Sequence, residues 1–144
     1  MLNRLVYVSE IRREHPVDIQ EIVSSAAQFN LTRNVTGALR FDGDHFIQLL
    51  EGAASILSHI FDTRIIPATS HQNIKFLALK PCKERVFKDW SMAYLSENGH
   101  ERDIAQKFMA EEGFNPRNCT ADDIVNLLCF LEESRQRNAK EAIL

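Results

Sequence analysis

The hydrophobic and polar positions of the chain fall into segments that alternate, as strands do, and segments with helical spacing. Residues 2–9 alternate between two faces, and Leu5 and Tyr7 share one of them. This pattern predicts a first strand. Pro16 is expected to open the helix that follows, with Asp18 in its first turn and Asn30 at its end. Its apolar positions recur at helical spacing: Ile19, Ile22, Val23, Ala26 and Ala27.

Four further strands and a second helix complete the predicted sheet and the helical layer that covers it. Residues 35–41 and 45–51 are predicted to be two strands joined around Asp42-Gly43, which indicates a hairpin because glycine readily adopts the positive φ of tight turns. An apolar stripe after Gly52 predicts a helix that Pro67 ends. Residues 74–79 and 91–95 are the remaining strands. The last of these is expected to carry Trp90, Met92 and Tyr94 on one face.

The order of these elements is βαββαββ, which predicts a ferredoxin-like α/β sandwich. We expect a five-stranded mixed sheet with two helices on one face, spanning residues 1–97. Residues 98–144 form a second region, with helices predicted at 102–112 and from Thr120 onward. These helices are expected to cover the other face of the sheet, and the charged chain from Glu132 is expected to fray apart from its last few residues.

Composition excludes several classes of function. The 144 residues carry a net charge of −3, which argues against nucleic-acid binding through phosphate neutralisation. No apolar run approaches the roughly 20 residues of a membrane span, and the N-terminus lacks the features of a signal peptide. The three cysteines have no metal-like spacing and are expected to be ordinary thiols. These features favour a cytoplasmic location.

Gln48 is the most informative polar residue, because it lies within a run that otherwise resembles a buried strand. An unpaired buried amide costs roughly 1–3 kcal/mol, so a partner in the protein or in a ligand is expected. Tyr7 and Trp90 taken alone are typical of core packing, and Asn30 of a helix end or turn. Together they favour a site, since Tyr7 and Gln48 occupy helix-facing positions where a ligand between the helices would contact both.

Four motifs together resemble a known family. They are Val6-Tyr7-Val8-Ser9, Asn30 six residues before Thr36-Gly37, Phe46-Ile47-Gln48-Leu49-Leu50-Glu51-Gly52, and Phe87-Lys88-Asp89-Trp90-Ser91-Met92. In order and spacing they resemble the BLUF domain, a blue-light sensor that uses FAD, over residues 2–96. The C-terminal part is similar to short BLUF proteins, which carry a helical cap in place of an attached enzyme.

The resemblance implies a flavin, FAD with FMN left open, lying between the two helices. Asn30 would bond the pyrimidine edge of the ring, and Gln48 would bridge the flavin and Tyr7. Blue light would drive an electron and then a proton from Tyr7 to the flavin and back, leaving the Gln48 amide rearranged. Trp90 and Met92 would lie close to this switch. The other expected flavin contacts are Ile22, Ala26, Arg64, Ile65 and His71.

The sequence also departs from the family pattern. Phe29 stands where many members carry a polar or His side chain. Ala68 and Ser70 stand where an Asp and an Arg often precede His71. The missing Arg would remove a phosphate or ribityl contact, for which Arg64 could partly compensate.

These observations lead to two hypotheses of different classes. The first is a flavin photoreceptor that signals to a downstream signalling or transcription-regulatory protein, without nucleic-acid or membrane partners. The alternative, motivated by Ala68 and Ser70, is a flavin-free interaction module on the same scaffold. An enzyme ranks third, because the sequence has no Ser-His-Asp arrangement, paired carboxylates or metal cluster. The sequence leaves homo-oligomerisation open.

Overall fold

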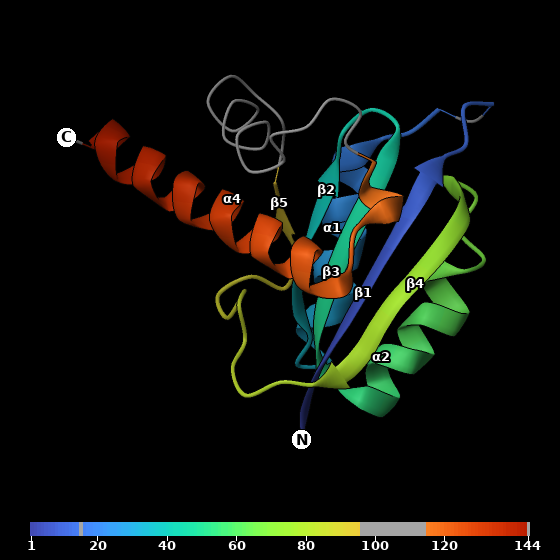
Figure 1. Ribbon diagram of the computed structural model, residues 1–144, viewed down its shortest axis with the longest axis horizontal. Helices are drawn as coiled ribbons and strands as arrows, with labels where there is room; N and C mark the ends of the chain where they lie inside the picture. Colours follow the sequence, from blue (N-terminus) through green and yellow to red (C-terminus); the bar gives the residue numbers. More distant parts are fainter. Residues whose placement is uncertain (15, 96–114, 144) are drawn as a thin grey trace.

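The computed structural model describes residues 1–14, 16–95 and 115–143, which form a five-stranded sheet with helices on both faces (Figure 1). The strand order is β4-β1-β3-β2-β5, and only the β2–β5 pair is parallel. In chain order the elements are β1 (Leu2–Ile11), α1 (Ile19–Leu31), β2 (Thr36–Phe41), β3 (His45–Ala53), α2 (Ala54–Ile60), the π-helical turn η1 (Phe61–Ile65), β4 (His71–Pro81), β5 (Ala93–Tyr94), the 3-10 turn η2 (Pro116–Asn118) and α4 (Ala121–Ile143). This is the predicted mixed sheet in a ferredoxin-like arrangement.

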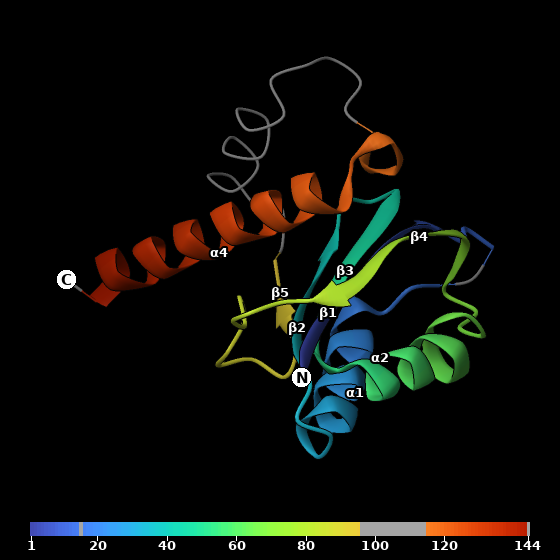
Figure 2. The same ribbon diagram turned by 60° about the horizontal axis from the view of Figure 1, so that its bottom comes forward.

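The sheet separates two hydrophobic cores. Helices α1 and α2 lie on one face and α4 crosses the other, as Figure 2 shows. Because side chains alternate along a strand, β1 sends Leu5 and Tyr7 into the core beneath α1 and α2, and Val6 and Val8 into the core beneath α4. The predicted division of β1 between two faces is confirmed.

Helix α1 begins later than predicted. Asp18 is its N-cap, and one of its carboxylate oxygens accepts from the Glu21 backbone N–H at 3.1 Å. The helix therefore starts at Ile19, and the expectation that Pro16 opens it is wrong. A side-chain acceptor satisfies an otherwise unpaired first-turn N–H, which sets the start more strongly than proline does. The helix ends one residue beyond Asn30, at Leu31.

The second helix and β4 also have boundaries that differ from the sequence prediction. The second helix changes to a π-helical turn at Phe61, and η1 ends at Ile65, before Pro67. Strand β4 starts at His71, three residues earlier than expected, and includes Pro81. Proline is tolerated there because β4 is an edge strand. The open side of β4 has no partner strand, so the N–H that Pro81 lacks is not needed for a hydrogen bond on that side.

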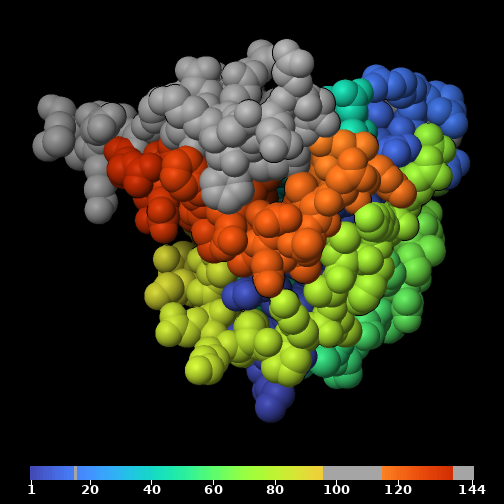
Figure 3. Space-filling view, in the orientation of Figure 1, coloured from blue at the N-terminus to red at the C-terminus, as the bar shows by residue number. Residues whose placement is uncertain are grey.

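The C-terminal region contains one long described helix. The predicted helix at 102–112 lies outside the described residues. Thr120 and Asp123 form the expected capping box, in which each side chain accepts from the other's backbone N–H at 3.1 Å. In Figure 3 the described part of α4 runs across this face, beside the segment 82–95. Its buried residues on the sheet are Ile124, Leu127, Leu128 and Leu131.

The prediction that the chain frays from Glu132 is wrong, because α4 continues to Ile143. Glu132 is only 6% exposed, and its carboxylate accepts from Arg135 at 2.6 and 2.9 Å and from Gln136 at 3.1 Å. Bonds three and four residues apart stabilise a helix even where charges dominate the sequence.

Trp90 and Met92 do not share a face, contrary to the sequence prediction. Met92 is 4% exposed and packs in the core with Tyr7, whereas Trp90 is 41% exposed and lies 4.5 Å from the Arg135 guanidinium of α4. The reason is that β5 contains only Ala93 and Tyr94, so the two-residue period of a strand does not hold at 90–92.

Candidate functional site

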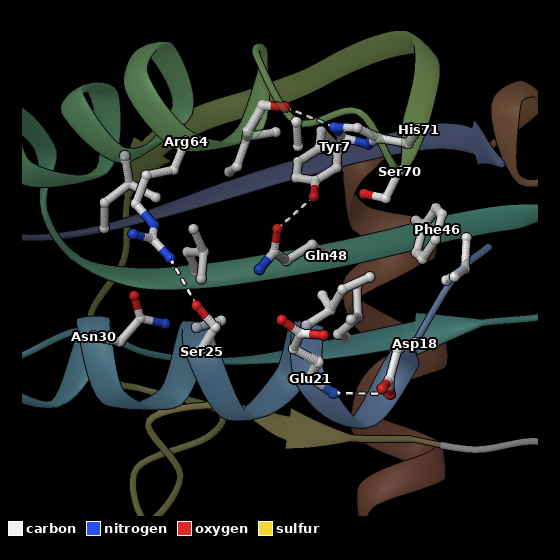
Figure 4. Close-up of a pocket in the computed structure, with 18 of the residues that line it drawn as sticks. Tyr7, Asp18, Glu21, Ser25, Asn30, Phe46, Gln48, Arg64, Ser70 and His71 are labelled. Carbon is white, nitrogen blue, oxygen red and sulfur yellow. Dashed lines mark hydrogen bonds between the residues drawn. The ribbon is translucent and has the colours of Figure 1, made fainter. Parts of the chain in front are cut away.

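A pocket of about 370 Å³ opens between α1 and the α2–η1 segment, above the helix-facing side of β1 and β3 (Figure 4). Its volume falls within the roughly 300–1,000 Å³ range of small-molecule and cofactor sites. All the residues predicted to contact a flavin line it: Tyr7, Ile22, Ala26, Asn30, Gln48, Arg64, Ile65 and His71. The fold thus brings residues from four elements and the start of a fifth into one cavity.

Tyr7 and Gln48 form the polar centre of the pocket. They are direct partners in the β1–β3 register, and the Tyr7 hydroxyl donates to Gln48 Oε1 at 2.5 Å. Both side chains are buried. Burial raises the pKa of the Tyr7 phenol above its usual value of 10.0, because a phenolate would lose its hydration there. Tyr7 therefore keeps its proton, and Gln48 Oε1 accepts it in a hydrogen bond.

The donor end of the Gln48 amide is less firmly bonded than its oxygen. Gln48 Nε2 contacts Met92 Sδ at 4.0 Å. A thioether is a weak acceptor, so the amide has donor capacity that a stronger acceptor in the pocket could use. Gln48 therefore has a protein partner at its oxygen and can take a ligand as partner at its nitrogen.

Asn30 adds a second amide at the end of α1 and is only 2% exposed. Its Nδ2 donates to the Ser91 carbonyl at 2.9 Å, so α1 is joined directly to the residue before Met92. That bond uses one N–H of the amide, which has a second N–H and an oxygen besides. The Asn30 side chain can therefore hold Ser91 and still bond a planar heterocycle.

His71 forms one wall of the pocket and uses both ring nitrogens within the protein. Nε2 lies 2.6 Å from the Ile65 carbonyl, and Nδ1 lies 2.6 Å from Ser9 Oγ. A carbonyl can only accept, so Nε2 carries the proton and Nδ1 accepts from the Ser9 hydroxyl. Burial lowers the pKa of His71, and the nearby Arg12 lowers it further against the opposing effect of the Ile65 bond. His71 thus contributes a neutral ring surface.

Arg64 connects the two helices that border the pocket. Its Nη2 donates to Ser25 Oγ on α1 at 3.2 Å, and Figure 4 shows the side chain reaching from the η1 side toward Ser25. Its guanidinium carbon also lies 4.0 Å from the centre of the Phe29 ring, and that of Arg33 lies 3.4 Å from it. Phe29, which departs from the family pattern, therefore packs against two cations.

The family comparison agrees with this geometry. A family model described as "Sensors of blue-light using FAD" (BLUF) matches residues 2–93, which is more than half of the chain. The chain belongs to the BLUF family. FAD is accordingly the cofactor of its family.

Individual BLUF proteins and structures are similar to this chain. The blue light- and temperature-regulated antirepressor BluF of Escherichia coli K12 is 36% identical over 124 residues, which cover 85% of this chain and 30% of BluF. The ground-state structure of BlsA is 28% identical, with a TM-score of 0.79 over 91% of this chain and 87% of BlsA. Klebsiella pneumoniae BlrP1 with FMN and cyclic diGMP is 32% identical, with a TM-score of 0.64 over 67% and 26% of the two chains. This chain thus spans less than a third of BluF.

Several pocket residues were missed by sequence reasoning. Asp18, Glu21 and Ser25 line the pocket from α1, and they could have been found because they share a helical face with Ile22 and Ala26. Ala68 and Ser70, which stand at the positions of the family's Asp and Arg, also line it. Others from the strands and α2 are apolar and carry no distinguishing signal in the sequence: Leu39, Phe46, Leu50 and Ile60.

Two of the predicted photoactive residues lie outside the pocket lining. Met92 is buried beside Gln48, and Trp90 lies at α4. Among the described residues no group of three His, Cys, Asp or Glu side chains could hold a metal ion. No helix within the described ranges is both long and apolar enough to span a membrane.

Proposed function

We propose that this chain is a blue-light photoreceptor that binds FAD non-covalently in the α1–η1 pocket and signals through a change in hydrogen bonding around Tyr7 and Gln48. The observation that carries the proposal is the bond between the Tyr7 hydroxyl and Gln48 Oε1 on the pocket wall. A proton donor and a reversible amide are thereby joined in a buried site.

The residues of the pocket fit a flavin ring. Apolar side chains from α1 and η1, Ile22, Ala26 and Ile65, border the space from opposite sides and suit the faces of a flat aromatic ring. The amides of Asn30 and Gln48 suit the donors and acceptors along the edge of a heterocycle. Arg64 is the cation that lines the pocket, and it can contact the phosphate-bearing tail.

Bound FAD would supply the group that absorbs blue light and accepts an electron. The protein residues then hold and move the proton. Tyr7 holds its proton at neutral pH, because its pKa is raised by burial, and the hydrogen bond gives that proton a path to Gln48 Oε1. The Gln48 amide can reverse its donor and acceptor ends without burying a charge. No substrate is converted, so the proposed activity is signalling and not catalysis.

The segment 90–92 offers a route for the signal. Ser91 accepts from Asn30 and Met92 contacts Gln48, while Trp90 contacts Arg135 on the opposite face of the sheet. A rearranged Gln48 amide would alter its contact with Met92, and the adjoining Trp90 would alter the packing of α4. We propose that the receiver is a signalling or transcription-regulatory protein in the cytoplasm. The antirepressor activity in the name of BluF supports this class of partner.

The second candidate function is a flavin-free interaction module. The observation in its favour is that Ala68 and Ser70 line the pocket at the positions of the family's Asp and Arg. The two candidates differ in a simple property. The photoreceptor is yellow when purified from a host with ample flavin, and the interaction module is colourless.

A pair of matched variants on α1 tests whether flavin occupies this pocket. Ala26 lines the pocket, and Ser24 is exposed on the same helix outside the lining. Adding a leucine side chain to the pocket should displace the flavin ring, so we expect Ala26→Leu to bind FAD at least about tenfold more weakly, or about 1.4 kcal/mol. Ser24→Leu should match the wild type. Quenching of flavin fluorescence during titration measures both affinities.

Equal affinity in the two variants would contradict the assignment of the pocket. Absence of flavin binding by the wild-type protein would favour the interaction module. Retention of flavin by the wild type without any light-induced spectral change would contradict the photoreceptor but leave flavin binding intact.

A further inference from the structure

Glu51 is a buried carboxylate on the α4 face of the sheet, outside the flavin pocket. Its side chain is fully buried. Oε2 accepts from Arg4 Nε at 3.0 Å and Arg4 Nη2 at 2.9 Å. Oε1 accepts from the backbone N–H groups of Val86 at 2.8 Å and Phe87 at 3.1 Å. A buried carboxylate is tolerated when its oxygens are bonded in this way, and removing a partner is costly.

Arg85 strengthens the same junction from the loop side. Its Nη1 donates to Thr36 Oγ1 and to the Glu51 carbonyl, both at 2.8 Å. Its Nη2 donates to the Asn34 carbonyl at 2.8 Å. Arg4 also reaches the loop, since its Nη2 donates to the Glu84 carbonyl at 3.1 Å. We call Arg4, Glu51 and Arg85 the Glu51 staple, because they attach residues 84–87 to β1, β2 and β3.

The stapled loop leads directly to the contacts of the pocket. Five residues after Phe87, Met92 reaches Gln48, and Ser91 accepts from Asn30. Between the staple and β5, the Trp90 carbonyl accepts from Gly37 N–H at 3.1 Å. Strand β5 itself is only two residues long. The position of Ser91 and Met92 therefore depends strongly on where residues 84–87 are held.

We propose that the Glu51 staple is a positioning element of the light switch, which holds Ser91 and Met92 against the amides of Asn30 and Gln48 and thereby sets the rate of dark recovery. The inference rests on the proposed function. In the dark state the amides of Asn30 and Gln48 meet a fixed loop. Return of a rearranged Gln48 amide must pass Met92, so a loop held less firmly lowers the barrier to return.

Arg85→Gln tests the proposal in the flavin-loaded 144-residue protein. It removes the charged, forked donor but leaves the pocket lining unchanged. The matched control is Lys88→Gln, because Lys88 is exposed in the same loop and loses the same charge. We expect dark recovery at least about five-fold faster in Arg85→Gln, which a barrier change of about 1 kcal/mol produces. Flavin stoichiometry and the size of the spectral shift should stay at wild-type values, and Lys88→Gln should recover at the wild-type rate.

Arg85→Lys is measured in parallel, since it keeps the charge but cannot reproduce the fork. We expect a rate above the wild-type rate there too, and this variant decides the question if Arg85→Gln does not fold. Recovery within twofold of wild type in the folded Arg85 variants would overturn the proposal. So would loss of flavin at unchanged recovery rate, because that indicates only a structural role. A wild-type protein that binds no flavin would contradict the proposed function itself.

Discussion

The bond between Tyr7 and Gln48 can be tested by a double-mutant cycle. Tyr7→Phe removes the hydroxyl and leaves Gln48 Oε1 without its donor. Gln48→Leu removes the amide and leaves the Tyr7 hydroxyl without its acceptor. The double variant removes both polar groups, so neither is left unpaired. The cycle therefore isolates the 2.5 Å hydrogen bond from the packing of the two side chains.

The expected coupling follows from burial. Tyr7 is 4% exposed and Gln48 is 8% exposed, so an unpaired group at either position approaches the roughly 1–3 kcal/mol cost of a buried, unsatisfied polar atom. Both residues also line the pocket, where water can replace a lost partner. We therefore expect a coupling near the lower end, about 1 kcal/mol, with the double variant less destabilised than the sum of the single variants.

Urea unfolding of the flavin-free protein measures the four free energies of unfolding. Flavin is removed because differences in its affinity would otherwise add to apparent stability. The midpoint and the slope are both recorded, since a changed slope would indicate a changed unfolded or native state. Additive single-variant effects, within about 0.5 kcal/mol, would refute the claim that these two groups are energetically joined.

Three further predictions address the tail of the flavin, pH and the output. The dissociation constants of FAD and FMN should lie within tenfold of each other, about 1.4 kcal/mol, because Ser70 stands in place of the family's Arg and Arg64 is already bonded to Ser25. Titration of the apo-protein with each flavin measures both, and a strong preference for FAD would mean that another basic contact exists. The pKa of His71 is lower in the folded protein than in the unfolded chain. As pH falls through about 6.5, His71 is therefore protonated in the unfolded chain before it is protonated in the folded protein, and the free energy of unfolding should decrease toward pH 5. In His71→Gln the free energy of unfolding should depend less steeply on pH, by at most about 1.4 kcal/mol per pH unit. If urea unfolding gives the same pH dependence for both proteins, His71 is not neutral in the folded state. Hydrogen exchange in residues 90–95 and 121–134 should differ between dark and blue light, and unchanged protection in both would exclude this route.

Much of the pocket was predictable because it depends on strand alternation and helical spacing. The alternation of residues 2–9 places Tyr7 on the helix-facing side, and Gln48 is its partner in the sheet register. Ile22 and Ala26 occur at helical spacing, and both line the pocket. Periodicity fixes which face a residue occupies, so it succeeds where the elements are regular.

The errors arose where irregular backbone or specific side-chain bonds decide the structure. Trp90 lies outside the two residues of β5, so the side of the sheet that it occupies could not be inferred from its separation from Met92 in the sequence. The extension of α4 beyond Glu132 depends on Glu132 being bonded to Arg135 and Gln136 next to buried positions. His71 is held at the pocket wall by Ser9 and by the Ile65 carbonyl. Ser9 is distant from His71 in the sequence, and a bond to a backbone carbonyl requires no particular residue type. Such contacts require three-dimensional information.

The most direct test of the account is the light-minus-dark absorption spectrum of the flavin-loaded wild type and Tyr7→Phe, recorded side by side. The Phe variant keeps the ring but loses the proton that Tyr7 donates to Gln48. We predict that both proteins are yellow, that blue light shifts the wild-type flavin absorption to longer wavelength and the shift decays in the dark, and that Tyr7→Phe shows no shift. A normal, reversible shift in Tyr7→Phe would contradict the claim that the Tyr7–Gln48 pair is the light switch.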